Sequence, residues 1–247
     1  ISSQFISALL MIAPALNKGI KLKITGKLVS ESYIRMTLRL MSEFNIIWTW
    51  IDNVITIKKQ DYITKNYTVE SDWSSASFWF QIAALSRTCD IRLKGLRKDS
   101  IQGDIKIMEI FSKLGVESSF KNKILILKRK KRSVFYKKID LIETPDLYQP
   151  LRCTIFAKKI KTETIGTQTL KYKESDRTNA VETELTRLNS NRIIKTYQDH
   201  RMAMSFAPLC LKIEEVIIND IEVVSKSYPK FWDDLSKGGF IISPLSD

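Results

Sequence analysis

Apolar residues recur at the spacing of amphipathic helices in several stretches of the chain, with short strand-like stretches between them. The first helix is predicted over residues 5–16, and residues 21–24 then alternate as a half-buried strand does. A second helix is predicted to begin at Ser30 or Ser32, where a hydroxyl can cap free backbone N–H groups. The apolar sides of these two helices are expected to be Phe5, Leu9, Leu10, Ile12 and Leu16 in the first, and Tyr33, Met36, Leu40, Met41 and Phe44 in the second.

The same alternation continues through the rest of the chain. Strands are predicted at residues 46–49, 54–57, 69–72, 90–93, 116–120 and 124–127, and further helices at residues 74–85, 102–114, 146–157, 175–188 and 199–211. Polar residues suited to capping precede these helices. Helices of similar length joined by short strands favour an α/β fold made of a repeated unit over one long doubly wound sheet.

Size and charge narrow the class of protein. The 247 residues, of which 44% are hydrophobic, suffice for one large or two modest domains with cores, and this argues against disorder. No apolar run approaches the roughly 20 residues of a membrane-spanning helix, so no membrane partner is expected. The 40 Lys and Arg exceed the 27 Asp and Glu by 13, which favours anionic partners without choosing among nucleic acid, lipid headgroups and small phosphorylated molecules.

Cysteine usage and the first residues bear on the compartment. Cys89, Cys153 and Cys210 are odd in number, far apart and in no C-x-x-C pair, so neither a disulfide framework nor a thiolate metal site is predicted. A reducing, cytoplasmic location is therefore expected. The first residues contain neither an initiator Met nor a signal-like segment, and we expect that the chain begins inside a longer protein.

Two common routes to nucleotide or nucleic-acid binding find little support. The eight glycines form neither G-x-G-x-x-G nor G-x-x-x-x-G-K-[ST], so the usual phosphate loops are not predicted. The longest basic run, residues 128–132, follows an apolar strand and has no interleaved aromatic residues. We interpret this run as a solvated strand end and expect no nucleic-acid partner.

Two polar segments that precede predicted helices are candidates for chemistry. The first segment, Lys171-Tyr172-Lys173-Glu174-Ser175-Asp176-Arg177, has two interpretations. It is a solvated helix start, whose acidic side chains are stabilised by the positive end of the helix dipole, or it is a site where cations hold a phosphate beside an acid/base. The segment Asp199-His200-Arg201 holds the single histidine of the chain at another helix start, where exposed N–H groups favour an anion. From these residues alone, each segment can be either a structural helix start or a functional site.

Taken together, a series of short motifs resembles the 5-enolpyruvylshikimate-3-phosphate synthase family. The motifs run in order along nearly the whole chain, and their order makes chance an unattractive explanation. They are Ser2-Ser3-Gln4, Gly26-Lys27-Leu28-Val29-Ser30 with Tyr33, residues 72–77, Gln102-Gly103-Asp104, Pro145-Asp146, Lys173-Glu174-Ser175-Asp176-Arg177, residues 196–204, and Lys226 with Tyr228-Pro229.

The resemblance implies an enzyme of aromatic amino-acid biosynthesis. The family transfers the enolpyruvyl group of phosphoenolpyruvate to the 5-hydroxyl of shikimate 3-phosphate and releases phosphate through a tetrahedral intermediate, without a metal or an organic cofactor. It has two similar domains, each built from three βαββαβ units. On that template residues 1–72 are the later part of the first, shikimate 3-phosphate-binding domain, and residues 73–247 are most of the second, phosphoenolpyruvate-binding domain.

The resemblance also implies roles for residues of the first domain. The residues expected to bind shikimate 3-phosphate are Ser2, Ser3, Gln4, Ser30 and Tyr33. The family's early Lys-Ser, Arg and other substrate contacts have no counterpart in this chain, so we expect the chain by itself to be inactive. The complete protein is expected to be a monomer.

In the second domain, the resemblance implies that acids and cations share the chemistry. Asp146 would contact the reacting hydroxyls and transfer protons, Lys173 would bridge the substrates, and Glu174 would exchange a proton with the methylene carbon. The residues expected to clamp phosphoenolpyruvate are Arg177, Arg201 and Lys226, and those expected to orient the reacting groups are Asp199 and His200.

Three alternatives remain at this point. A related transferase acting on UDP-N-acetylglucosamine shares the architecture, but the Lys-Glu-Ser-Asp-Arg and Ser-Ser-Gln segments favour the shikimate enzyme. A basic nucleic-acid-binding module would require salt-sensitive binding centred on residues 128–132. A degenerate remnant with only a structural role is the third.

Overall fold

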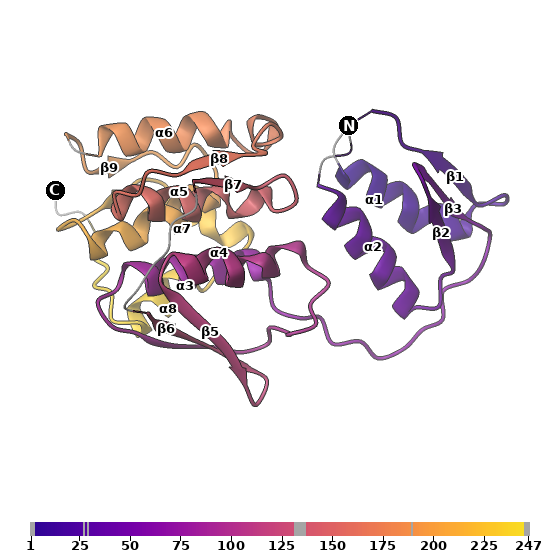
Figure 1. The fold of residues 1–247 in the computed structure, drawn as a ribbon, viewed down its shortest axis with the longest axis horizontal. Helices are drawn as coiled ribbons and strands as arrows, with labels where there is room; N and C mark the ends of the chain where they lie inside the picture. The colour runs from indigo at the N-terminus through magenta and orange to yellow at the C-terminus, as the bar shows by residue number, and fades with distance from the viewer. Residues whose placement is uncertain (1–2, 27, 29, 131–136, 189, 245–247) are drawn as a thin grey trace.

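The computed structural model describes residues 3–26, 28, 30–130, 137–188 and 190–244, and it divides into two parts. Figure 1 shows the first part, with helices α1 and α2, beside a larger part that begins at α3. Residues 58–72 connect the two parts and form neither helix nor strand, so the strand predicted at residues 69–72 is wrong. Among the described residues, no helix is both long enough and apolar enough to span a bilayer.

The first part packs two helices on a small antiparallel sheet. Its elements are α1 (Ser3–Ile12), β1 (Ile20–Lys23), α2 (Glu31–Glu43), β2 (Trp48–Ile51) and β3 (Val54–Ile57). The strand order is β1-β3-β2, and a two-residue turn at Asp52 and Asn53 joins β2 to β3. The core consists of Leu10, Ala13, Ile34, Leu38, Met41, Ile46, Ile55 and Ile57.

The predicted apolar sides of α1 and α2 are largely wrong. On α1, Leu10 is fully buried, whereas Phe5 and Ile12 are 68% and 53% exposed. On α2 the buried residues are Ile34, Leu38 and Met41, so the packed side is rotated from the predicted one. Periodicity identifies residues that share a helix side, but the neighbouring elements decide which side is covered.

The second part combines helices with short strands in three small sheets. Its helices are α3 (Trp73–Leu85), α4 (Ile107–Lys113), α5 (Tyr148–Ala157), α6 (Arg177–Arg187), α7 (His200–Phe206) and α8 (Phe231–Lys237). Its strands are β4 (Asp90–Leu93), β5 (Val116–Lys121), β6 (Ile124–Arg129), β7 (Lys138–Asp140), β8 (Glu163–Ile165), β9 (Ile193–Ile194) and β10 (Ile217–Ile218). The antiparallel order β4-β6-β5 and the parallel pairs β7-β8 and β9-β10 agree with the predicted alternation of helices and short strands.

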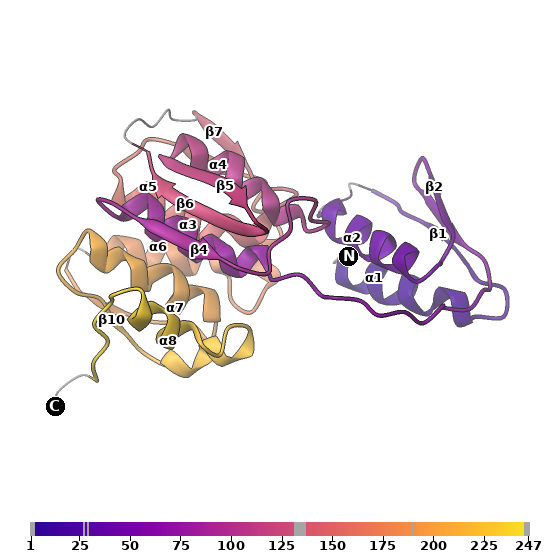
Figure 2. The same cartoon turned by 90° about the horizontal axis from the view of Figure 1, so that it is seen from below.

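Helix α3 lies at the centre of the second part, and its sequence explains this position. It is apolar on all sides, and eleven of its thirteen residues are buried. Phe80 packs edge-on against Phe111 of α4, and Phe78 packs in the same way against Phe231 of α8. Figure 2 shows α3 close to the β4–β6 sheet. This rigid centre fixes the start of α3, which faces the first part.

The two parts meet where α2 begins. The predicted serine cap is not formed: Ser30 precedes α2 in a left-handed conformation, and its side chain makes no capping hydrogen bond. Glu143 of the second part takes this role, because its Oε2 accepts the Ser32 backbone N–H at 2.8 Å. The Ser32 hydroxyl donates to the Glu143 carbonyl at 2.7 Å. The negative charge of the Glu143 carboxylate is also stabilised by the positive end of the α2 helix dipole.

Candidate active site

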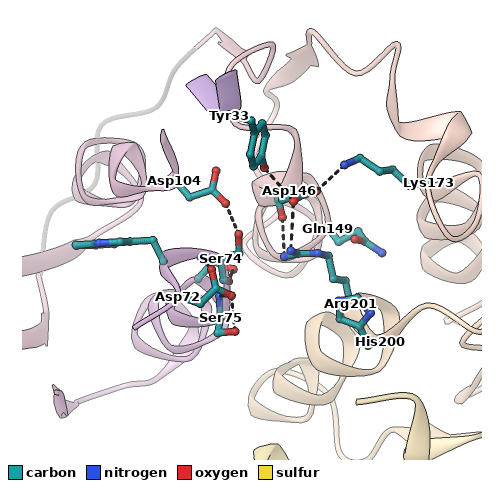
Figure 3. A network of polar contacts seen from close by, with 12 residues as sticks. Tyr33, Asp72, Ser74, Ser75, Asp104, Asp146, Gln149, Lys173, His200 and Arg201 are labelled. Atoms are coloured by element: carbon teal, nitrogen blue, oxygen red, sulfur yellow. Dashed lines mark hydrogen bonds and ion pairs between the residues drawn. The ribbon is translucent and has the colours of Figure 1, made fainter. Parts of the chain in front are cut away.

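Asp146 is the centre of a polar cluster that draws on both parts of the structure (Figure 3). It lies in a 3₁₀ turn, Pro145–Leu147, which runs into α5. Its Oδ1 accepts from Arg177 Nη1 at 2.8 Å, and its Oδ2 accepts from the Tyr33 hydroxyl at 2.9 Å. Arg201 Nη2 lies 3.3 Å from Oδ2, and Lys173 Nζ lies 3.6 Å from Oδ1. One carboxylate thus joins a tyrosine of α2 to three cations of the second part.

These cations decide the ionisation of Asp146. Burial favours the neutral acid, but the charges of Arg201, Lys173 and Arg177 outweigh it and hold the pKa of Asp146 well below its usual range. Burial and the charges of Asp104 and Asp146 raise the pKa of Tyr33, which therefore remains a hydrogen-bond donor at neutral pH. Asp146 is thus a carboxylate that can accept hydrogen bonds from hydroxyl groups.

Arg177 connects three carboxylates from three segments. It is the first residue of α6, whose N-cap Asp176 accepts the Asn179 N–H. Its side chain is 2% exposed and donates to Asp146 at 2.8 Å, to Glu174 Oε2 at 2.6 Å and to Asp199 Oδ2 at 2.8 Å. A buried guanidinium requires such partners, because an unpaired buried charge is costly.

Asp199 supports this arrangement from the start of α7. As the N-cap, it accepts the Arg201 N–H at 2.9 Å, which leaves its other oxygen for Arg177. Burial opposes ionisation of Asp199, but the charge of Arg177 and its hydrogen bond outweigh burial and lower the pKa. Gln149 and Ser175 also donate to Asp199, each at 3.3 Å. Asp199 therefore fixes both the start of α7 and the buried side chain of Arg177.

His200 lies beside the cluster as a neutral imidazole at pH 7. Burial and the positive charge of Arg201 lower its pKa. Its Nδ1 is buried without a hydrogen-bond partner and lies 3.9 Å from the nearest Asp199 oxygen. Arg201 itself stays charged: burial opposes the charge, but Asp146 and Asp104 outweigh burial and raise the pKa of Arg201.

Lys173 and Glu174 are the more accessible members of the cluster. The Lys173 side chain is 25% exposed and the Glu174 side chain 39% exposed. A cation and an acid thus remain within reach of a bound molecule, while the buried arginine holds their segment in place.

The remaining predicted site residues lie on other segments of the chain or outside the described residues. Ser3 and Gln4 are on α1, Ser30 precedes α2, and Ser2 lies outside the described residues. Lys226 lies at the end of a 3₁₀ turn, Ile221–Lys226, and its Nζ donates to the Gln198 carbonyl at 3.1 Å. The structure therefore places Tyr33, Asp146, Lys173, Glu174, Arg177, Asp199 and Arg201 in one hydrogen-bonded and ion-paired cluster.

A family model described as EPSP synthase (3-phosphoshikimate 1-carboxyvinyltransferase) matches residues 1–235. The chain belongs to this family. It is 42% identical to a 3-phosphoshikimate 1-carboxyvinyltransferase of Bacteroides fragilis, over 97% of the chain and 64% of that protein. It is 36% identical to one from Methanospirillum hungatei, over 96% of the chain and 60% of that protein. The chain thus spans less than two thirds of the length of these EPSP synthase relatives.

Solved structures of the EPSP synthase family share the fold. An EPSP synthase structure from Acinetobacter baumannii superposes with a TM-score of 0.74 at 20% sequence identity, covering 96% of this chain and 60% of the other. A second structure from the same organism gives a TM-score of 0.71 at 19% identity. The predicted α/β architecture and the predicted family are therefore confirmed.

The family motif Gln102-Gly103-Asp104 received no role from the sequence, and the structure supplies one for each residue. Gln102 accepts the Trp73 N–H and donates to the Ser71 carbonyl, which fixes the start of α3. Gly103 leaves room for Ser32, since an added Cβ would lie 2.8 Å from the Ser32 Cβ. Asp104 is 3% exposed and accepts a short hydrogen bond from Ser74. The motif therefore joins the start of α3 to α2.

Two further features lie apart from the cluster. A hollow of about 1800 Å³ extends along β4, α8 and residues 241–244, and neither Asp146 nor its partner cations line it. Arg129, in the basic run, ends β6 and donates to the Gly115 and Lys130 carbonyls, while residues 131 and 132 lie outside the described residues. Within the described ranges, no group of three or more His, Cys, Asp and Glu is placed to hold a metal ion.

Asp104 gives a pH-dependent prediction. Burial, with a further contribution from Asp146, raises its pKa to about 7, compared with about 3.9 in an unfolded chain. Between these values the folded protein holds a proton that the unfolded chain has lost, so the stability falls as pH rises through this window. Asp104→Asn, whose amide oxygen still accepts from Ser74, is expected to raise Tm by at least about 5 °C at pH 8 and to change it little near pH 4.

Differential scanning calorimetry of the full-length protein at pH 4, 6 and 8 checks this expectation. The matched control is Asp61→Asn, at an exposed position, which should leave Tm unchanged at each pH. A Tm difference for Asp104→Asn that does not grow between pH 4 and pH 8 would contradict the assigned pKa.

Gly103 gives a prediction about the contact between the two parts. Gly103→Ala places a Cβ against Ser32 and the Glu143 carbonyl, so the start of α2 must move and its hydrogen bonds to Glu143 must weaken. Overpacking of this kind costs about 1–3 kcal/mol. Protection of the Ser32 and Tyr33 amides from hydrogen exchange is expected to fall about 10-fold or more. Adding Ser32→Gly removes the opposing Cβ and should relieve the clash, so the protection of the neighbouring Tyr33 amide should return. Unchanged protection of these amides in Gly103→Ala would refute the close contact.

Proposed function

We propose that the full-length protein transfers the enolpyruvyl group of phosphoenolpyruvate to the 5-hydroxyl of shikimate 3-phosphate, with release of phosphate. The observation that carries this proposal is the convergence on Asp146 of Tyr33 from the first part and of Arg177, Arg201 and Lys173 from the second. Two anionic substrates repel each other, so a site that joins them needs several converging cations. The family membership supports the same reaction.

The two parts then receive different substrates. We assign residues 1–72 to the later part of a shikimate 3-phosphate-binding domain and residues 73–247 to most of a phosphoenolpyruvate-binding domain. The separate hydrophobic cores of the two parts support this division. Closure of one part on the other, at Tyr33 and Asp146, would bring the 5-hydroxyl to the enolpyruvyl carbon.

Asp146 and Glu174 divide the proton transfers between them. The 5-hydroxyl oxygen adds to C2 of phosphoenolpyruvate as its proton passes to Asp146, which orients the hydroxyl, and the departing phosphate later takes this proton. Glu174 delivers a proton to the methylene carbon C3, which yields the tetrahedral intermediate, and removes one from the same carbon as the C–O bond to phosphate breaks. The exposure of the Glu174 side chain supports a role at the substrate.

The cations differ in how readily they bind an added anion. Each bonded nitrogen of Arg177 already has a carboxylate partner, so its contact with phosphoenolpyruvate requires Glu174 or Asp146 to move away. Among the acids of the described part of the chain, Arg201 is bonded to Asp146 alone, and Lys173 lies 3.6 Å from the same carboxylate. We therefore assign the phosphoenolpyruvate clamp to Arg201 and Lys173 first, with Lys226 completing it and Arg177 joining when its acids rearrange.

A thermal-shift experiment tests the substrate assignment. Shikimate 3-phosphate is expected to raise the Tm of the full-length protein, because it binds the folded state alone, whereas UDP-N-acetylglucosamine is expected to have no effect. The reverse pattern would assign the protein to the other transferase. The 247-residue chain by itself is expected to release no phosphate from the two substrates, since it spans only 64% of the length of the Bacteroides fragilis relative, and turnover at ordinary enzyme rates would refute that expectation.

A further inference from the structure

The turn before α7 has a backbone conformation that its residues do not favour. Tyr197 and Gln198 both have positive φ values, 53° and 58°, although neither is glycine. Two consecutive left-handed residues of this kind are sterically disfavoured, because the Cβ of a non-glycine residue crowds the neighbouring carbonyl oxygen. Surrounding contacts must therefore hold this turn in place.

Glu184 of α6 supplies those contacts. Its side chain is fully buried, and it takes no part in the cluster around Asp146. Its Oε1 accepts from the Tyr197 hydroxyl at 2.7 Å, and its Oε2 accepts from the Lys195 backbone N–H at 3.2 Å. Arg187 Nη1, 3.2 Å from Oε1, supplies the balancing charge. One buried carboxylate thus binds the residue that precedes the turn, Lys195, and the tyrosine within it, Tyr197.

The turn at residues 196–199 fixes the positions of two site residues, Lys226 and Asp199. The Gln198 carbonyl accepts from Lys226 Nζ at 3.1 Å, which is the contact that places this amine beside α7. The Asp199 N–H donates to the Thr196 carbonyl at 2.9 Å, and Asp199 then caps α7 and binds Arg177. A change in the turn therefore moves the Lys226 amine and the Asp199 carboxylate together.

We propose that Glu184 is a positioning residue that, through Tyr197 and the strained turn at residues 196–199, sets the place of the Lys226 amine for an anionic substrate. The inference rests on the proposed function in one respect, the binding of phosphoenolpyruvate by Lys226. Glu184 touches no substrate in this account. It acts by holding a backbone carbonyl in a conformation that the sequence disfavours.

Tyr197→Phe, made in the full-length protein, tests the hydrogen bond between the Tyr197 hydroxyl and Glu184 by removing it. The ring remains and Glu184 keeps its other partners, so the fold is preserved while the Tyr197 hydrogen bond is lost. We expect KM for phosphoenolpyruvate to rise about 10-fold with kcat nearly unchanged, because a ground-state contact is weakened. Glu184→Gln is expected to act in the same direction. The matched control is Tyr62→Phe, which removes a phenolic hydrogen bond to the Met11 carbonyl far from the turn and should leave KM unchanged.

A second substitution distinguishes positioning from general support of the fold. Glycine adopts positive φ without steric cost, so Gln198→Gly added to Tyr197→Phe should restore KM most of the way to the wild-type value. A wild-type KM in Tyr197→Phe, or a raised KM that Gln198→Gly leaves unchanged, would overturn the proposal.

Hydrogen exchange separates this inference from the proposed function. The amides of residues 195–199 should exchange faster in Tyr197→Phe than in the wild type, and Gln198→Gly should slow them again. Absence of turnover in the wild-type protein would refute the proposed function alone, and the exchange rates would then decide whether Glu184 holds the turn. Unchanged exchange in both Tyr197→Phe and Glu184→Gln would refute the role of Glu184 itself.

Discussion

Arg177→Met in the full-length protein is expected to lower the free energy of unfolding by about 3–5 kcal/mol. The guanidinium is 2% exposed and is bonded to Asp146, Glu174 and Asp199. Removing it leaves the carboxylates of Asp199 and Asp146 buried beside each other with fewer cations. The measurement is urea unfolding of the second part, followed by tryptophan fluorescence.

The control for this prediction is Arg152→Met. Arg152 also makes a bidentate ion pair, with Glu182. The Glu182 side chain, however, is 47% exposed and can be hydrated when it loses its partner. We expect a loss of about 1 kcal/mol or less there. Equal losses for the two variants would show that Arg177 contributes as an ordinary ion pair and does not hold the site together.

Glu174→Gln is expected to reduce kcat about 10²–10⁴-fold, with KM for both substrates changed little. Glutamine has nearly the same shape, and its amide oxygen still accepts from Arg177, so the segment should keep its position. It cannot deliver or remove a proton at the methylene carbon. Steady-state phosphate release with each substrate varied in turn provides both constants.

Glu182→Gln is the matched control for Glu174→Gln. Glu182 lies on α6, is partly exposed and pairs with Arg152, so the substitution alters an acid of similar exposure outside the cluster. Its kcat should remain near the wild-type value. Near-normal turnover in Glu174→Gln would remove Glu174 from the proton transfers.

The elements of the fold were largely predictable, whereas the covered sides of the first two helices were not. Strands 54–57 and 90–93 and the helix after Asp72 follow directly from local alternation and capping. The side that α1 presents to its neighbours depends on packing partners distant in the sequence. Phe5 is therefore exposed although it is apolar.

The candidate site divides in the same way. Asp146, Arg177 and Arg201 were found because each lies in a family motif at a helix start. Glu143 lies in none of the family motifs, and its hydrogen bond to Ser32 depends on the approach of two separate parts. Asp104 lies in a motif, but its raised pKa follows from burial beside Asp146, which sequence alone does not reveal. Glu184 carries no local signal, since its partners are a turn and an amide eleven and more residues away.

We propose that the acids and cations around Asp146 form one site for two anionic metabolites. The most direct test is phosphate release by the full-length protein supplied with phosphoenolpyruvate and either shikimate 3-phosphate or UDP-N-acetylglucosamine. We expect release that requires shikimate 3-phosphate and that Asp146→Asn abolishes or greatly slows. Release with the sugar nucleotide, or undiminished release in Asp146→Asn, would contradict it.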